Sequence, residues 1–210
     1  MKNKVVLVGA PGVGKTFFFL SVTRQYSAMS ASDHHPTIGA TYGQLQMYVD
    51  DRGVVSHVTT DPLYEGVKGP KLDLWDTAGQ ERYSSLLPMY LRNAIVAVVM
   101  HDNDPRQDNV ERAAKEVRNV REVAPHAKIF VVQTKSDLRR PFNYKFVRDV
   151  DADGWAYITT VGDDLTSVDN AILSIAKLAG EVIGSAKEEE EEEEETLQLP
   201  DSPKRYMCCK

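Results

Sequence analysis

Residues 9–16 read Gly-Ala-Pro-Gly-Val-Gly-Lys-Thr and fill every fixed position of the pattern G-x-x-x-x-G-K-[ST]. The apolar, β-branched run at 4–8 favours a strand before this pattern, and residues 15–25 can form a helix after it. In that frame the glycines let backbone N–H groups turn inward on phosphate groups, and the helix N-terminus adds its dipole. Lys15 would then reach the β- and γ-phosphates of a nucleotide, and the Thr16 hydroxyl would take one position on Mg²⁺. The rival explanation is a chance glycine-rich turn, which the strand–loop–helix frame disfavours.

The length and composition suit one ordinary domain followed by a tail. The chain has 210 residues, of which 42% are hydrophobic, and this is enough for a buried core. The apolar run near the N-terminus is broken at once by glycine and proline, and the longest later run, 94–100, is shorter than the about 20 residues that span a bilayer. We therefore expect a soluble, intracellular protein. The only cysteines are Cys208 and Cys209, which excludes a disulfide scaffold.

The net charge of −6 comes from one segment. The eight glutamates Glu188–Glu195 contribute −8, which leaves +2 for the rest of the chain. The expected globular part is thus nearly neutral and carries no basic footprint for nucleic acid. Residues 184–210 combine this acidic run with proline, serine and lysine. Such a segment cannot bury enough apolar surface to fold, so we predict a disordered acidic tail there.

Apolar β-type runs alternate with segments of helical periodicity. This alternation predicts an α/β fold with a mostly parallel six-stranded sheet and helices on both faces. The expected strands are 5–8, 42–49, 72–75, 95–100, 129–132 and 155–158, and the expected helices are 15–25, 106–123 and 167–183. These elements place the domain at 1–183. The turn-rich segment 50–70 either extends the hairpin between the second and third strands or is disordered.

A second signal follows the strand expected at 72–75. Asp76 stands at the end of that strand, where a carboxylate can hold Mg²⁺ through water. Gly79 lets its backbone N–H approach a γ-phosphate, and Gln80 stands where an amide would orient an attacking water. Taken alone, D-x-x-G is most often only a turn.

A third signal, Thr134-Lys135-Ser136-Asp137, follows the strand expected at 129–132. The Asp137 carboxylate can accept hydrogen bonds from N1–H and the N2 amino group of guanine, and the aliphatic stem of Lys135 can lie along the base. Adenine offers no such pair of donors, so Asp137 favours a guanine nucleotide. Taken singly, the tetrapeptide reads more often as a helix cap. Three motifs in this order at strand ends nevertheless predict a nucleotide site.

These motifs resemble those of the Ras superfamily of small GTPases, and of the Rab family of membrane-traffic switches in particular. Residues 75–83, Trp-Asp-Thr-Ala-Gly-Gln-Glu-Arg-Tyr, are nearly identical to the Rab motif, and 36–42 resemble the Rab switch I segment. The run 83–94 is most similar to the early-endosomal branch. The resemblance covers residues 3–183 and implies the P-loop small-GTPase fold, with GTP or GDP and Mg²⁺ as ligands.

The resemblance implies chemical roles for the matching residues. Thr37 would close over Mg²⁺ and the γ-phosphate, and catalysis would rest on Gln80, Lys15 and Thr37. The Mg²⁺ ligands would be Thr16, Thr37 and Asp76. The nucleotide would contact Gly9, Pro11, Gly12, Val13, Gly14, Lys15, Thr16, Gly79, Thr134, Lys135, Asp137, Thr160 and Val161.

The resemblance also implies partners and a location. Effectors would read three aromatic residues, Tyr42, Trp75 and Tyr90, although Trp75 could equally be a core residue. Cys208 and Cys209 resemble the doubly geranylgeranylated end of a Rab protein, which would anchor the chain stably to a membrane. The implied partners are an exchange factor, an activating protein, effectors and the prenylation machinery, and the expected state is a monomer. The expected location is the cytoplasmic face of an intracellular membrane, an endosome by analogy, in exchange with the cytosol.

Three departures from the family pattern bear on turnover and affinity. Pro11 stands where the family usually has Gly or Ser beside the catalytic glutamine, so we expect slow intrinsic hydrolysis of GTP. Thr134 replaces the usual Asn, whose amide both binds the base and braces the phosphate loop, and one hydroxyl cannot do both. In the last loop, only Thr159-Thr160-Val161 matches the family's Ser-Ala-Lys contact with the base.

The leading prediction is a GTP hydrolase that binds GTP and GDP with Mg²⁺ and recruits effectors as a membrane-traffic switch. A rival from another class is a Rab-like binding module that hardly hydrolyses GTP and acts as an interaction scaffold. Pro11 and Thr134 suggest this rival, whereas Gln80 and Thr37 argue against it. Asp137 disfavours a third function, that of an ATPase.

Overall fold

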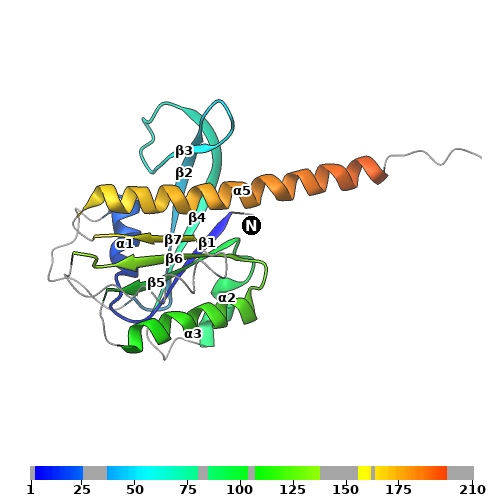
Figure 1. Cartoon of the computed structure of the whole chain (residues 1–210). Helices are drawn as coiled ribbons and strands as arrows, with labels where there is room; N and C mark the ends of the chain where they lie inside the picture. Colours follow the sequence, from blue (N-terminus) through cyan, green and yellow to red (C-terminus); the bar gives the residue numbers. More distant parts are fainter. Residues whose placement is uncertain are drawn as a thin grey trace, which may run out of the picture.

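A seven-stranded sheet in the order β3-β2-β4-β1-β5-β6-β7 forms the centre of the molecule (Figure 1). The computed structural model describes residues 3–25, 37–79, 85–103, 107–137, 156–161 and 164–197, with the side chains of 107–110 and 188–197 excepted. The strands are β1 (Lys4–Val8), β2 (Ala40–Val49), β3 (Val55–Thr59), β4 (Val67–Thr77), β5 (Val96–Asp102), β6 (Lys128–Thr134) and β7 (Ala156–Thr159). The helices are α1 (Lys15–Val22), α2 (Leu87–Leu91), α3 (Gln107–Val123) and α5 (Leu165–Leu197).

Strand pairing confirms the mostly parallel α/β fold. β1 lies between β4 and β5 and pairs with both in parallel, and β6 and β7 continue the parallel part. β2 is antiparallel to both β4 and β3. The predicted number of six strands is wrong, because residues 55–59 form the additional edge strand β3. All five residues of β1 are buried, which explains why Val5–Val8 are continuously apolar rather than alternating.

Helices cover both faces of the sheet, with α5 and α3 on opposite sides in Figure 1. Alternate side chains of β1 divide between two cores: Val5 and Leu7 face one, and Val6 and Val8 face the other. The first core contains the buried residues of α1 and α5, and the second contains those of α3 and Leu91 of α2. The parallel strands therefore end at the same edge of the sheet, and the three sequence motifs lie at this edge.

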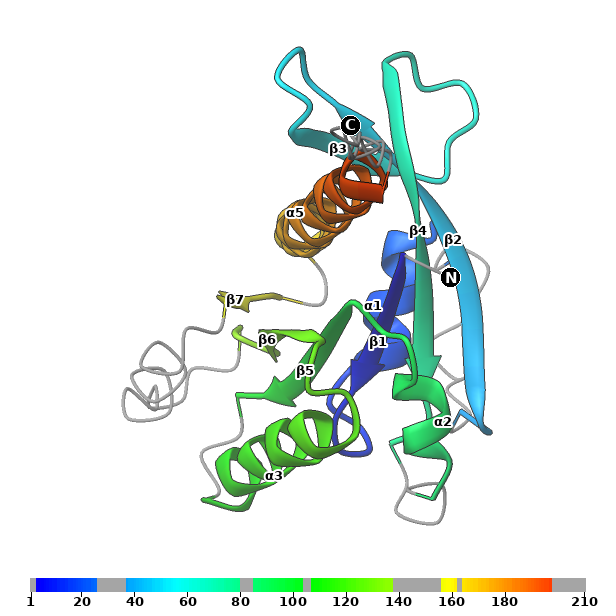
Figure 2. The ribbon, with the colours of Figure 1, turned by 90° about the vertical axis from the view of Figure 1, so that its right-hand side faces the viewer.

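Residues 50–70 form an ordered extension of the sheet, as the hairpin alternative predicted. β3 pairs with β2, and Figure 2 shows the outer ends of β2, β3 and β4 extending past α5. Aromatic contacts pack the loop between β3 and β4 against β2 and β3. The Tyr64 ring stacks on His57, with centroids 4.1 Å apart, and meets Tyr48 edge-on at 4.5 Å. Tyr48 is buried, so the extension has a small core of its own.

The last helix is longer than the sequence analysis predicted. α5 continues to Leu197 and projects beyond the sheet, so the prediction of disorder from residue 184 is wrong for 184–197 (Figure 1). Glutamate and alanine have high intrinsic helix propensity, and the packed part of α5 supplies a preformed nucleus on which the helix extends. Residues 198–210 lie outside the described part of the chain. Among the helices that the structure describes, none combines the length and apolar character needed to cross a membrane.

Candidate functional site

Residues 9–16 connect the carboxyl end of β1 to the first turn of α1, as the motif predicts. Lys15 is 5% exposed, and its Nζ donates hydrogen bonds of 2.9 Å to the carbonyl oxygens of Gly9 and Ala10. Gly9 has φ +146°, and a Cβ there would collide with the carbonyl oxygen of Met100. A glycine is therefore required where the loop passes over β5.

The buried ammonium of Lys15 defines an anion site. Burial lowers the pKa of Lys15 to about 8, and the carboxylates of Asp76 and Glu116 oppose that shift. Within the described residues, the two carbonyls of Gly9 and Ala10 are the groups that bond the ammonium directly. An anion seated on the loop would remove the penalty of the buried charge, which is what a phosphate group does.

Three oxygen-bearing side chains converge beside Lys15. The Thr16 hydroxyl donates to Asp76 Oδ2 at 2.7 Å and lies 2.8 Å from the Thr37 hydroxyl. The Thr37 Oγ1 lies 3.4 Å from the same Asp76 oxygen. Pairing of β2 with β4, together with the 2.8 Å bond from Ala78 N–H to the Gly39 carbonyl, brings Thr37 next to this strand end.

These residues fit a Mg²⁺ ion. Asp76 is fully buried, and its Oδ1 has no hydrogen-bond partner among the residues that the structure describes. Burial raises the pKa of Asp76, while the Thr16 hydroxyl, the Lys15 charge and the Thr37 hydroxyl oppose the rise. A buried carboxylate with a free oxygen between two hydroxyls is the donor set of a hard divalent cation that keeps part of its water shell.

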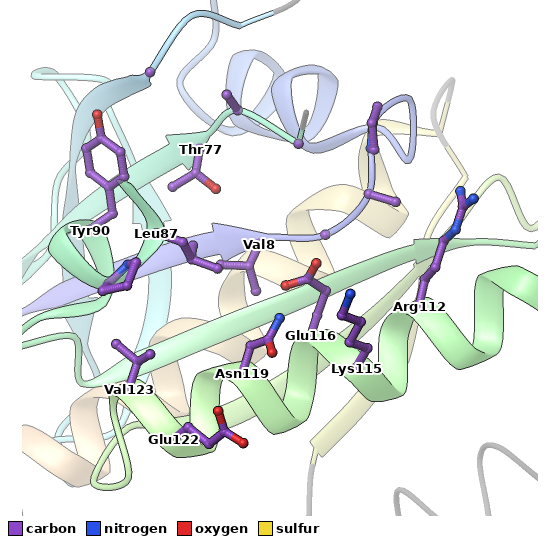
Figure 3. Close-up of a pocket in the computed structure, with 17 residues that line it drawn as sticks. Val8, Thr77, Leu87, Tyr90, Arg112, Lys115, Glu116, Asn119, Glu122 and Val123 are labelled. Atoms are coloured by element: carbon purple, nitrogen blue, oxygen red, sulfur yellow. The ribbon is translucent and has the colours of Figure 1, made fainter. Parts of the chain in front are cut away.

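A cavity of about 590 Å³ opens beside this cluster, between the phosphate loop and α3 (Figure 3). Pro11, Gly39 and Gly79 line it, and Pro11 is exposed at its rim. A Cβ on Gly79 would contact Lys15 Nζ and the backbone of Ala10, so the backbone of Gly79 closes directly on the phosphate loop. Gln80, the predicted water-orienting residue, lies outside the described part of the chain.

The third motif braces the phosphate loop. The Thr134 hydroxyl is buried and lies 2.6 Å from the Val13 carbonyl and 3.1 Å from the His101 carbonyl. Because a hydroxyl has one proton, a Thr134 hydroxyl that donates to the backbone here cannot also donate to a base. Lys135 Nζ donates to the Gly12 carbonyl at 2.7 Å and forms a 3.1 Å ion pair with Asp102. These contacts hold the backbone of Lys135 at φ +55°, a conformation that residues other than glycine seldom adopt.

The remaining predicted base contacts lie at the ends of neighbouring strands. Asp137 follows β6 and is exposed, with its carboxylate available to a ligand. Thr160 follows β7 and is buried, and its N–H bonds the Gln133 carbonyl at 2.7 Å while its own carbonyl accepts from Ser136 N–H at 3.2 Å. The Val161 N–H donates to Ser167 Oγ at 2.9 Å. The fold thus brings the third motif and the last loop together.

The three aromatic residues predicted for effector contact form one row. Tyr42 and Trp75 have ring centroids 5.3 Å apart, and Trp75 and Tyr90 are 6.1 Å apart. Tyr42 is 49% exposed, and its hydroxyl donates to Asp73 at 2.8 Å. Trp75 is half-buried: it packs against the second core and has the Lys4 ammonium 5.0 Å from its ring centroid, while its contact with the exposed Tyr42 lies at the surface.

Sequence reasoning missed two charged residues that belong to this region. Asp102 ends β5 next to the phosphate loop, and its position at the carboxyl end of a parallel strand was a usable signal. Glu116 lies in the middle of α3, and no motif marked it. The proposed lipid-bearing residues Cys208 and Cys209 lie outside the described residues.

The loop after β1, the oxygen cluster at the end of β4 and the braces from β6 define a P-loop nucleotide-binding protein. Residues 4–137 match the family model described as Ras of Complex, Roc, domain of DAPkinase. The Ras-related protein RABA1c of Arabidopsis thaliana is 30% identical over 180 residues, which are 82% of this chain and 72% of that protein. The Ras-related protein YPTC6 of Chlamydomonas reinhardtii is 30% identical over 183 residues, with the same two shares. The Ras-related protein RIC2 of Oryza sativa subsp. japonica is 33% identical over 138 residues, 65% of this chain and 54% of that protein.

The chain therefore belongs to the Roc/Ras family of GTPase domains, as a divergent Rab-like small GTPase.

Proposed function

We propose that this protein is a switch that binds GTP and GDP with Mg²⁺, hydrolyses GTP slowly and recruits effectors at a membrane in its GTP state. The observation that carries the proposal is the cluster of Thr16, Thr37 and Asp76 beside the buried Lys15. Thr37 belongs to the segment between α1 and β2, whereas the other three residues belong to the phosphate loop, α1 and β4. A ligand bound by all of them would fix the segment of Thr37 to the phosphate loop and β4, as GTP and Mg²⁺ order the switch segments of GTPases.

The chemistry follows from charge and position. Lys15 would contact phosphate oxygens and stabilise negative charge that develops on them during hydrolysis. Thr16, Thr37 and Asp76 would hold Mg²⁺, which supplies charge neutralisation at the phosphates when bound. The Gly79 N–H would approach the γ-phosphate, and Gln80 would orient the attacking water.

Base recognition would rest on Asp137. Its exposed carboxylate is the acceptor for the N1–H and N2 donors of guanine, and the stem of Lys135 would lie along the base while its ammonium stays on the phosphate loop. Thr160 and Val161 would contribute backbone contacts from the last loop. Thr134 braces the loop through the Val13 carbonyl and would leave one base contact unmade.

Effector recruitment would use the row of Tyr42, Trp75 and Tyr90. Two apolar side chains close to this row in sequence are unusually exposed: Ile38 is 80% exposed, and Met89, which precedes Tyr90, is 59% exposed. Such a patch suits a protein partner, because its burial would release apolar surface from water. Since Ile38 follows Thr37 and Trp75 precedes Asp76, the shape of the patch would depend on the bound nucleotide.

Membrane attachment would come from lipid groups on Cys208 and Cys209, added by a prenylation enzyme. Two chains give stable anchoring, whereas one gives marginal binding. The cytoplasmic face of an endosomal membrane would be the site, in exchange with the cytosol. Because Glu188–Glu195 would be repelled by an anionic leaflet, the end of α5 would hold the domain away from the lipid surface. Replacing these glutamates with Gln and Ser should strengthen binding to anionic liposomes, and unchanged binding would refute this spacer role.

The test is nucleotide extraction from the purified protein, followed by single-turnover hydrolysis of GTP. We expect GDP or GTP in the extract and slow but measurable hydrolysis, faster than in Gln80→Leu. Pro11→Gly should be faster than the natural chain, because it removes the ring at the rim of the cavity. Hydrolysis no faster than in Gln80→Leu would indicate a binding module that does not cycle, and adenine nucleotide in the extract would indicate an ATPase.

A further inference from the structure

The cavity between the phosphate loop and α3 has one wall that the proposed chemistry does not use. One side consists of the phosphate loop and Gly79, where the γ-phosphate of GTP would lie. The opposite wall is α3, which contributes charged residues along its length (Figure 3). The charged residues are Arg112, Lys115, Glu116 and Glu122.

Among these residues, Glu116 has a distinct environment. It is half-buried, whereas Arg112, Lys115 and Glu122 are exposed. Glu116 also lines a second, small cavity beside Ala10 and Val13 of the phosphate loop, where it is the one acidic side chain among the described lining residues and Arg112, one helical turn earlier, is the basic one. In Figure 3 its side chain projects from α3 toward the end of β1, where the phosphate loop begins. Its negative charge is therefore less screened by water than the charges around it.

Two further observations define the charge balance at this place. No lysine or arginine in the described part of the chain forms a salt bridge with Glu116. After Asp76, Glu116 is the second carboxylate that acts on the Lys15 ammonium. The charge of Glu116 thus acts on the phosphate site without a direct ion pair in the described part of the chain, although Arg112 lines both cavities with it.

We propose that Glu116 is a specificity-determining residue that weakens the binding of GTP relative to GDP and so favours the off state of the switch. GDP and GTP share their α- and β-phosphates, and GTP would add negative charge on the side of Gly79 and Pro11, which line the same cavity as Glu116. This inference rests on the proposed function, because it concerns the same nucleotide site.

The expected size of the effect follows from Coulomb's law. Unit like charges separated by about 10 Å at an effective dielectric of about 20 to 40 repel enough to change affinity roughly four- to fifteenfold. Both nucleotides would feel part of this repulsion, so the ratio of the two dissociation constants is the informative quantity.

The experiment compares dissociation constants for GTP and GDP in the natural chain, in Glu116→Gln and in Glu116→Asp, with Mg²⁺ present. We expect Glu116→Gln to lower the ratio of the GTP constant to the GDP constant by roughly three- to tenfold. Glu116→Asp, which keeps the charge, should retain most of the natural ratio. The matched control is Glu122→Gln, on the same helix and cavity but farther from the phosphate loop in Figure 3, and it should leave the ratio unchanged.

Salt separates charge from packing. Raising the ionic strength should reduce the difference between the natural chain and Glu116→Gln, which a purely structural role would not do. A protein that binds both nucleotides but keeps the same ratio in Glu116→Gln would overturn this inference alone. Failure of the natural chain to bind either nucleotide would overturn the proposed function, and this inference with it.

Discussion

At the scale of single residues, the contacts that remain for a nucleotide depend on which hydrogen bonds the side chains of the site already make within the protein. The Thr134 hydroxyl donates to the Val13 carbonyl at 2.6 Å, and Lys135 Nζ donates to the Gly12 carbonyl at 2.7 Å. The Thr134 and Lys135 side chains therefore both bind the phosphate loop. The sequence predicts that one hydroxyl cannot both bind the base and brace the phosphate loop, as an amide does. The structure shows that Thr134 makes the contact with the phosphate loop, and this could be known only from the distances in the fold.

Thr134→Asn should tighten the binding of GDP. An asparagine amide can keep the contact with the Val13 carbonyl and add a hydrogen bond to the ligand, and one such bond amounts to about 1 kcal/mol, or five- to tenfold. The measurement is the dissociation rate of GDP, which should fall by about that factor. Thr134→Ser, which keeps the hydroxyl, serves as the control and should resemble the natural chain. Equal rates in Thr134→Asn and the natural chain would show that the contact is not missing.

His101 should make folding sensitive to acid. It is 6% exposed, and burial lowers its pKa, while the carbonyl and carboxylate of Asp102 oppose the shift. In the unfolded chain a histidine takes up a proton near its ordinary pKa of about 6.5. The unfolded state therefore binds more protons than the folded state below this pH, and stability is full above it and falls as the pH drops through it.

The check is urea unfolding at pH 7.5 and pH 5.5. His101→Gln should lose less stability between these two pH values than the natural chain, because Gln cannot take up the proton. His126→Gln, at an exposed position before β6, is the control and should behave as the natural chain does. A loss in His101→Gln as large as that in the natural chain would assign the acid sensitivity to other groups.

At the scale of elements, hydrophobic periodicity predicted the buried strands of the sheet but neither its edge strand nor the full length of the last helix. The continuously apolar runs became the buried parallel strands β1, β5 and β6, because both of their faces are covered. The edge strand β3 was harder to predict, since its five residues are only partly buried and owe their conformation to pairing with β2. Composition misled at α5, because the rule that acidic tracts stay unfolded ignores a packed helix immediately before them.

The end of α5 should respond to salt. In residues 188–195, like charges four positions apart repel, and negative charge near a helix C-terminus opposes the helix dipole. Raising the salt concentration from about 0.05 to 1 M shortens the Debye length to roughly 3 Å, so the helix content measured by circular dichroism should increase. A variant with Gln at all eight positions should have high helix content and little salt response. A natural chain whose helix content ignores salt would contradict this account of the extension.

At the scale of the whole molecule, the site exists because parallel strands end at one edge of the sheet. The phosphate loop follows β1, Asp76 lies in β4, and Thr134 ends β6, so motifs distant in sequence meet there. This much could be predicted, because strand ends carry the motifs in the chain. Glu116 could not be predicted, since its place beside the phosphate loop depends on how α3 packs on the sheet rather than on any local pattern.

The central claim is that Thr16, Thr37 and Asp76 hold Mg²⁺ for a guanine nucleotide on the phosphate loop. The most direct measurement is the affinity for GDP in Mg²⁺ and after its removal with EDTA, in the natural chain and in Asp76→Asn. We predict that removal weakens binding to the natural chain by at least about tenfold, or roughly 1.4 kcal/mol, and weakens binding to Asp76→Asn far less. An affinity for GDP in the natural chain that does not depend on Mg²⁺ would contradict the account.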